Sequence, residues 1–169
     1  MLEFTLVVII FSVLVAVAFE RIAATRTRME RARIEHVVGA MRSTLALEFA
    51  RRHVAGGDAP PPADLVGSNV FRLMDPPPAG YEAAVTFADW SAAPPGTWFY
   101  DADRRAVVYR AHDPSALPPP RSGPAGAWKA VAQGPDGGGD GRVEPAREPL
   151  SGVGLVRLHE GAASMEKPR

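Results

Sequence analysis

The chain has 169 residues, and its 19 lysines and arginines balance its 19 aspartates and glutamates, so its formal net charge is zero at pH 7. This balance argues against a general nucleic-acid-binding protein, because such proteins carry an excess of positive charge. The sequence contains no cysteine, which excludes disulfide bonds, thiolate metal sites and cysteine nucleophiles. The predicted N-terminal helix takes up about a third of the chain, so the remainder can form only one small domain.

The N-terminal stretch FTLVVIIFSVLVAVAF, residues 4–19, is uncharged and apolar. As a helix it would be about 24 Å long, near the short end of what crosses a bilayer. Residues 20–54 continue in helix-forming types with no proline and one glycine. We therefore predict one long helix from Phe4 to Val54 rather than a cleaved secretory signal. A buried core helix is the alternative, but the first half has no polar stripe to face water.

In the second half of this helix the apolar residues recur at intervals of three and four, which indicates an amphipathic helix. The residues predicted to pack on the rest of the protein are Ile34, Val38, Met41, Leu45 and Phe49. Because this stripe starts at Ile34, the segment from Glu20 to Arg33 is expected to project as a polar connector. Its arginines are interpreted as a solvated face, with anionic lipid headgroups as the alternative partner.

Proline-rich stretches follow the helix and favour short elements. The clearest signal is a β-hairpin with strands at 97–100 and 106–110 around a polar turn at 101–105. Further strands are predicted at 127–132 and 154–160, and residues 133–149 are expected to form a mobile loop. The predicted hairpin core consists of Trp98, Tyr100, Val108 and Tyr109.

These elements predict an α+β fold in which a long N-terminal helix packs through its second half on a small antiparallel sheet. The predicted organisation is a transmembrane half-helix at 1–20, an amphipathic half-helix at 21–55, a connector and sheet domain at 56–160, and a disordered tail at 161–169.

The motif FTLVV followed by an unbroken apolar helix resembles the N-terminus of type IV pilins and of type II secretion pseudopilins. Three further stretches resemble some proteobacterial pilin-like proteins: GSN at 67–69, the prolines before Tyr81, and PPGTWFYDADRRAVVYR at 94–110. The resemblance implies a single-pass inner-membrane protein, with its head in the periplasm or in an extracellular filament. It also implies other pilin-like subunits and the membrane as partners, and no nucleic acid. The assembly helix would begin with Phe4, Thr5, Leu6, Val7 and Val8.

The chain departs from this family pattern at two positions. Glu3 stands where the family has the glycine after which a prepilin peptidase cuts, and Val8 stands where the family has a glutamate. In the family that carboxylate attracts the terminal amine of a neighbouring subunit, so Val8 implies a minor subunit rather than a shaft-forming one. The alternative hypothesis is a membrane-anchored periplasmic binding domain that never polymerises.

The distribution of charge conflicts with the topology that the family implies. The positive-inside rule would place the arginines that follow the apolar run, Arg21, Arg26 and Arg28, in the cytoplasm. The family topology places them outside, and we adopt the family topology.

Catalytic and metal-binding interpretations are weaker. The four histidines show no metal-ligand spacing and are interpreted as surface or packing residues: His36, His53, His112 and His159. The turn residues Asp101 and Asp103 are explained by turn geometry. No cofactor is predicted; the best cation candidate is a calcium site at Asp136, Asp140 and Glu144, whose spacing does not match an EF-hand. No nucleophile, base and orienting group can be assembled, so the sequence predicts no enzyme.

Overall fold

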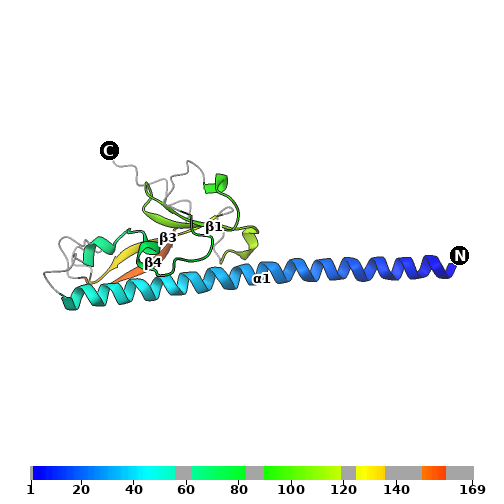
Figure 1. The fold of residues 1–169 in the computed structure, drawn as a ribbon, viewed down its shortest axis with the longest axis horizontal. Helices are drawn as coiled ribbons and strands as arrows, with labels where there is room; N and C mark the ends of the chain where they lie inside the picture. Colours follow the sequence, from blue (N-terminus) through cyan, green and yellow to red (C-terminus); the bar gives the residue numbers. More distant parts are fainter. Residues whose placement is uncertain (1, 56–61, 83–89, 119–124, 136–149, 159–169) are drawn as a thin grey trace.

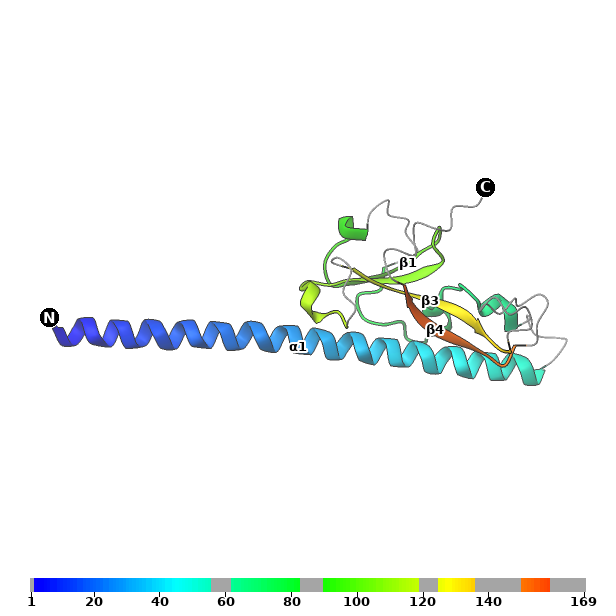
Figure 2. The same ribbon diagram turned by 180° about the vertical axis from the view of Figure 1, so that it is seen from behind.

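The computed structural model describes residues 2–55, 62–82, 90–118, 125–135 and 150–158. Helix α1, Leu2–Ala55, is unbroken and 54 residues long, which confirms the predicted single helix. Its first half projects clear of the rest of the molecule, and its second half lies along the sheet (Figures 1 and 2). The described residues from 62 to 158 are called the head. The α+β class is confirmed, because the helix accompanies one four-stranded sheet.

The sheet has the order β1-β2-β3-β4, and every neighbouring pair is antiparallel. Its strands are β1 (Thr97–Asp101), β2 (Ala106–Arg110), β3 (Ala125–Gln133) and β4 (Gly152–Leu158). The hairpin was therefore predicted almost to the residue, whereas β3 and β4 each begin two residues earlier than predicted. Asp101 ends β1 instead of starting the turn. The proline-rich connections contain four short 3₁₀ helices: η2 (Pro62–Leu65), η3 (Val70–Leu73), η4 (Trp90–Ala92) and η5 (Pro114–Ala116).

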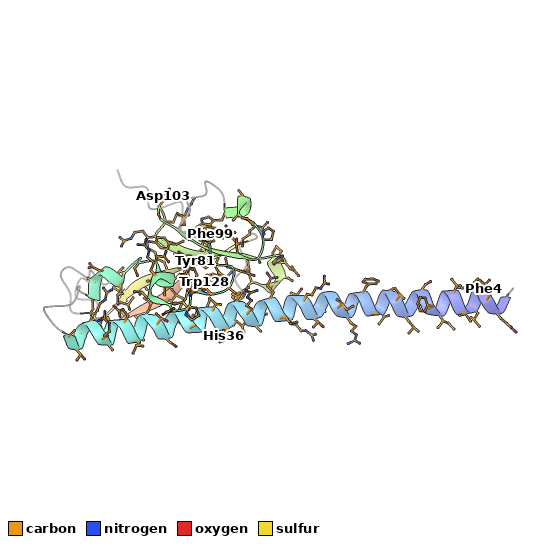
Figure 3. All side chains as sticks on the ribbon, viewed as in Figure 1. Phe4, His36, Tyr81, Phe99, Asp103 and Trp128 are labelled. Atoms are coloured by element: carbon orange, nitrogen blue, oxygen red, sulfur yellow. The ribbon has the colours of Figure 1, made fainter. Side chains whose placement is uncertain are left out.

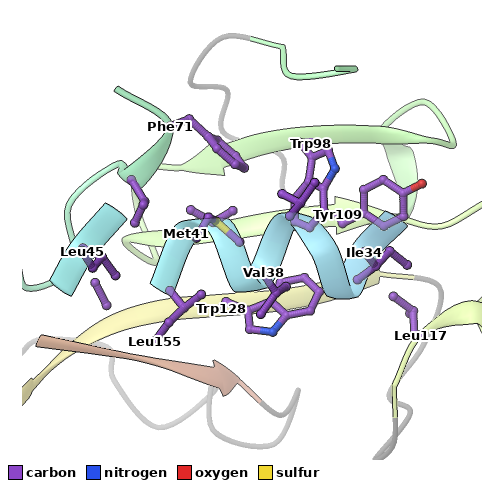
Figure 4. Packing of buried hydrophobic residues seen from close by; sticks show 14 of the residues in the cluster. Ile34, Val38, Met41, Leu45, Phe71, Trp98, Tyr109, Leu117, Trp128 and Leu155 are labelled. Carbon is purple, nitrogen blue, oxygen red and sulfur yellow. The ribbon is translucent and has the colours of Figure 1, made fainter. Parts of the chain in front are cut away.

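The main core lies between α1 and one face of the sheet (Figure 4). The helix contributes Ile34, Met41 and Leu45, which are at most 1% exposed, together with the buried Val38 and the partly buried Phe49. Trp98 on β1 is directly opposite Tyr109 on β2, and their ring centroids are 4.6 Å apart. The helical period of three and four thus places the predicted stripe against the aromatic face of the sheet.

Alternate residues of the hairpin face the other side of the sheet, as the period of two requires. Val108 belongs to this second cluster with Phe99 and Trp90, away from α1. Val108 is fully buried, but it packs on the opposite face of the sheet from Trp98 and Tyr109. Both faces are apolar, so the alternation of polar and apolar residues that would reveal the face is missing from this hairpin.

Three stretches that carry the second resemblance meet at one corner of the head. The Asn69 side chain caps η3 by accepting a hydrogen bond from the Phe71 N–H, and it donates to the Tyr81 hydroxyl at 3.0 Å. The Tyr100 hydroxyl donates to the carbonyl of Gly67, whose φ of 65° favours glycine. The motifs are thus joined by hydrogen bonds although they are far apart in the sequence.

Two expectations fall on residues outside the described ranges. Most of the predicted mobile loop, residues 136–149, and the predicted tail, residues 161–169, are among them.

Candidate functional site

The first half of α1 carries the residues that the resemblance assigns to assembly. Phe4, Leu6, Val7 and Val8 lie in its first turns, and each is between 47% and 73% exposed. Thr5 lies in the same turns and is exposed as well. Side chains of this half stand around the helix without contact to the head (Figure 3). Among the described residues, α1 is the one helix long and apolar enough to cross a membrane.

A second group of exposed apolar side chains lies on one face of α1, mostly in the half that carries the head. Ile22, Met29, Leu47 and Val54 are 50%, 68%, 74% and 87% exposed. They are separated by 7, 18 and 7 residues. At about 100° per residue all four fall within about 40° of one another around the helix. We call these four residues the outer stripe.

The outer stripe faces away from the head. By the same rotation it lies about 140° from the core residues Ile34, Met41 and Leu45. Arg33 and Arg51 border the stripe on the side toward the head, but both side chains are turned away. Arg33 donates to the Ala79 carbonyl at 2.9 Å, and Arg51 binds Glu48 at 2.7 Å. The guanidinium groups of Arg33 and Arg51 therefore point away from the stripe, but the exposed His36 lies within about 20° of Met29 and Leu47 and interrupts the stripe between them.

Almost all exposed large apolar side chains are on the helix. In the part of the chain that the structure describes, those that lie on α1 include the outer stripe and the first-half residues, and the one exception is Val156 on β4. Exposed apolar surface of this extent marks sites of membrane or protein contact. The structure therefore places the candidate association surface on α1 and not on the head.

A polar cluster joins α1 to the end of the head that lies nearest the N-terminal half. The Glu30 carboxylate accepts hydrogen bonds from the Tyr109 hydroxyl at 2.9 Å and from the His112 N–H at 2.8 Å, and it lies 3.2 Å from His112 Nδ1. The Thr27 hydroxyl donates to Asp113 at 2.8 Å. We call Thr27, Glu30, Tyr109, His112 and Asp113 the polar latch.

The polar latch corrects the expectation that residues 20–33 form a free connector. Contacts with the head begin at Thr27, because polar side chains extend the interface beyond the apolar stripe. Burial raises the pKa of the Glu30 carboxyl, but the hydrogen bonds from His112 and Tyr109 more than offset this, so its pKa lies below the usual range. Burial and the neighbouring Glu30 together raise the pKa of the Tyr109 hydroxyl.

The two turn aspartates have different environments. Asp101 is completely buried, and its Oδ2 accepts hydrogen bonds from Trp90 Nε1 at 2.6 Å and from the Arg104 guanidinium at 2.8 Å. Its Oδ1 accepts from the N–H groups of Asp103 and Arg104 at 3.0 Å. Asp103 is exposed, so the pair does not form a shared acid–base site. Asp101 instead fastens η4 and the turn to the second face of the sheet.

The remaining histidine and metal candidates do not meet in the described chain. His36, His53 and His112 are exposed, and His112 binds Glu30. His159 and the calcium candidates Asp136, Asp140 and Glu144 lie outside the described residues. Within the described ranges, no group of three or more acidic or histidine side chains is placed to hold a metal ion.

Sequence reasoning missed the outer stripe and the polar latch. The stripe has a readable signal, since 18 residues are five helical turns and align Met29 with Leu47. The latch has none, because the donors that bind Glu30 lie 79 to 83 residues further along the chain. Comparisons with protein-family models, curated proteins and solved structures found no match.

Proposed function

We propose that this protein is a structural or assembly subunit of a pilin-like filament, as a minor pilin or pseudopilin of a type IV pilus or type II secretion system. In this role α1 anchors the chain in the inner membrane and joins a bundle of similar helices, and the head faces the periplasm or the outside of the filament. The observation that carries the proposal is the outer stripe. The resemblance of the N-terminal motif supplies the family.

The outer stripe favours assembly over a solitary anchor. A helix that only anchors a binding domain needs apolar surface along the membrane span, which ends near Phe19. Met29, Leu47 and Val54 lie about 15, 42 and 52 Å further along the axis, beyond the reach of the hydrocarbon. Burying such side chains against another helix is favourable by roughly 1.5 to 3 kcal/mol each. A parallel neighbouring helix could cover both the span and the stripe.

Val8 supports a minor role in such an assembly. It lies in the exposed first half of α1, where it offers packing but no carboxylate for a neighbour's amine. Helices in lipid can associate by close packing alone, so the chain could still join a bundle. Without the charged contact it would not drive repeated addition of its own copies. Val8 is also the residue that favours the alternative, a single-pass anchored binding domain that never polymerises.

Cysteine cross-linking tests the proposal cleanly, because the natural chain contains no cysteine. Leu47→Cys places a thiol on the outer stripe, and Arg42→Cys places one on an exposed part of α1 about 140° away. A photo-cross-linker with a maleimide group is attached to each thiol in native membranes, so the partner needs no cysteine. We expect Leu47→Cys to cross-link to a second chain that has its own apolar N-terminal helix, identified by mass spectrometry. The yield from Arg42→Cys should be several-fold lower. If Leu47→Cys stays monomeric, or if both variants react equally, the assembly role is wrong and the solitary anchor replaces it.

A further inference from the structure

Three arginines follow the apolar run of α1 and form what we call the arginine collar: Arg21, Arg26 and Arg28. All three are exposed, and none makes an ion pair within the described residues. Several other arginines of α1 are engaged, because Arg31 pairs with Glu35, Arg33 binds the head, and Arg52 pairs with Glu48. Arg42 lies further along the helix and also has no ion pair among the described residues. The collar is thus a set of charges without an ion-pair partner in the part of the chain that the structure describes.

The position of the collar matches the surface of a membrane that α1 crosses. Arg21, Arg26 and Arg28 lie about 3, 10 and 14 Å beyond Phe19 along the helix axis. The headgroup region extends roughly 5 to 8 Å outside the hydrocarbon. Helical side chains tilt toward the N-terminus, so these long side chains reach back toward the membrane.

The three guanidinium groups also surround the helix instead of forming one stripe. Arg21 and Arg28 are seven residues apart and share a face, whereas Arg26 lies about 140 to 160° away from them. Headgroups on both sides of the helix would therefore meet positive charge. Glu20 is the one acidic side chain between Phe19 and Met29, so residues 20–29 carry two positive charges in excess, three arginines against one glutamate.

Acidic groups at the membrane-proximal end of the head are bound inward. Glu30 accepts hydrogen bonds from Tyr109 and His112, and Asp113 accepts them from Thr27 and Ser115. These contacts occupy the carboxylates that would otherwise attract the collar. The end of the molecule that faces the membrane therefore presents positive charge outward.

We propose that the arginine collar binds the phosphate groups of anionic phospholipids at the membrane surface. The inference rests on the membrane-anchored part of the proposed function and is independent of assembly with other subunits. Guanidinium groups bind phosphate oxygens with two parallel hydrogen bonds. Each basic residue near an anionic membrane contributes about a fivefold gain in affinity, from about 1 kcal/mol per charge.

A matched pair of double variants tests this inference in the full-length protein. Arg21→Gln with Arg28→Gln removes two collar charges. Arg42→Gln with Arg72→Gln removes two exposed arginines that also lack an ion pair in the described chain but lie further from the span. Phosphatidylglycerol and phosphatidylcholine are titrated into detergent-solubilised protein, and bound lipids are counted by native mass spectrometry.

We expect the wild type to retain phosphatidylglycerol in preference to phosphatidylcholine. The collar variant should bind phosphatidylglycerol about 25-fold more weakly, at fivefold per charge, and the control should change less than twofold. Replacing Arg21 and Arg28 by lysine should keep most of the affinity, because charge is retained. Equal retention of both lipids by the wild type, or equal losses in both double variants, would overturn the inference. So would displacement of the lipid by inorganic phosphate or a short oligonucleotide at equal concentration.

Carbonate extraction of native membranes separates this inference from the proposed function. If the protein remains in the membrane but shows no lipid preference, only the inference about the arginine collar is wrong. Protein that is released by carbonate contradicts the membrane-anchored function on which the collar depends.

Discussion

Replacing Asp101 with asparagine tests the hydrogen bonds that hold a buried carboxylate in the head. Asp101 is the one charged side chain that is buried among the described residues. An asparagine would keep the oxygen that accepts from the turn N–H groups but would place an amide NH₂ opposite Trp90 Nε1 and the Arg104 guanidinium. Two donors would then face another donor in a site closed to water. We expect a loss of about 3 kcal/mol from the buried donors that lose their acceptor, since the partly exposed Arg104 can turn toward water.

The assay is thermal unfolding of the full-length protein in detergent, followed by near-ultraviolet circular dichroism. For a head of this size the melting temperature should fall by at least about 10 °C. Asp103→Asn is the matched control, since it changes an exposed residue of the same turn and should stay within about 0.5 kcal/mol. Trp90→Phe removes one of the donors that would face the asparagine amide. Adding it to Asp101→Asn should therefore cost less stability than Trp90→Phe costs in the wild type. Equal effects at Asp101 and Asp103, or an unchanged melting temperature, would refute the reasoning.

Two further predictions follow from the helix. Gly39→Ala should stabilise the protein by about 1 kcal/mol, because the added methyl group has no neighbour within 4 Å and alanine is the better helix former; a lower melting temperature would contradict the open site. Glu30→Gln should lower the melting temperature at pH 7 but flatten its fall between pH 5 and pH 3. Because folding lowers the pKa of Glu30, this residue stabilises the folded state fully above its pKa in the unfolded chain, about 4.3. The stabilisation is lost as the pH falls through the lower pKa of the folded state. An equally steep fall in the variant would show that Glu30 does not carry the acid sensitivity, which Asp101 would then supply.

Local patterns in the sequence were sufficient for the helix and the hairpin. The period of three and four in Ile34, Met41 and Leu45 defines the core face of α1 without knowledge of its partner. The hairpin follows from aromatic and β-branched residues around a polar turn, and its strands end within one residue of the prediction.

Contacts between distant segments were not predictable from such patterns. The sequence around Glu30 is typical of an exposed glutamate on a helix. Only the folded chain brings Tyr109 and His112 within hydrogen-bond distance of it. Asp101 and Asp103 look equivalent in the sequence of the turn. In the structure Trp90 binds and covers Asp101, whereas Asp103 is exposed. The face of the sheet on which Val108 packs was also not predictable, because both faces of its strand are apolar.

The polar latch and the apolar core together set how the outer stripe is presented. Glu30 and Leu45 are both fixed to the head and lie about 22 Å apart along the axis. Attachment at two separated levels fixes the direction of the head along α1 and also its rotation about the helix. The stripe then faces away from the head along the whole contact, so a partner helix could reach Met29 and Leu47 without meeting the sheet. A head held only through its apolar core could rotate or lift at the membrane-proximal end, where Met29 lies. Weakening the latch should therefore reduce association through Met29, which directly precedes Glu30, more than association through Leu47.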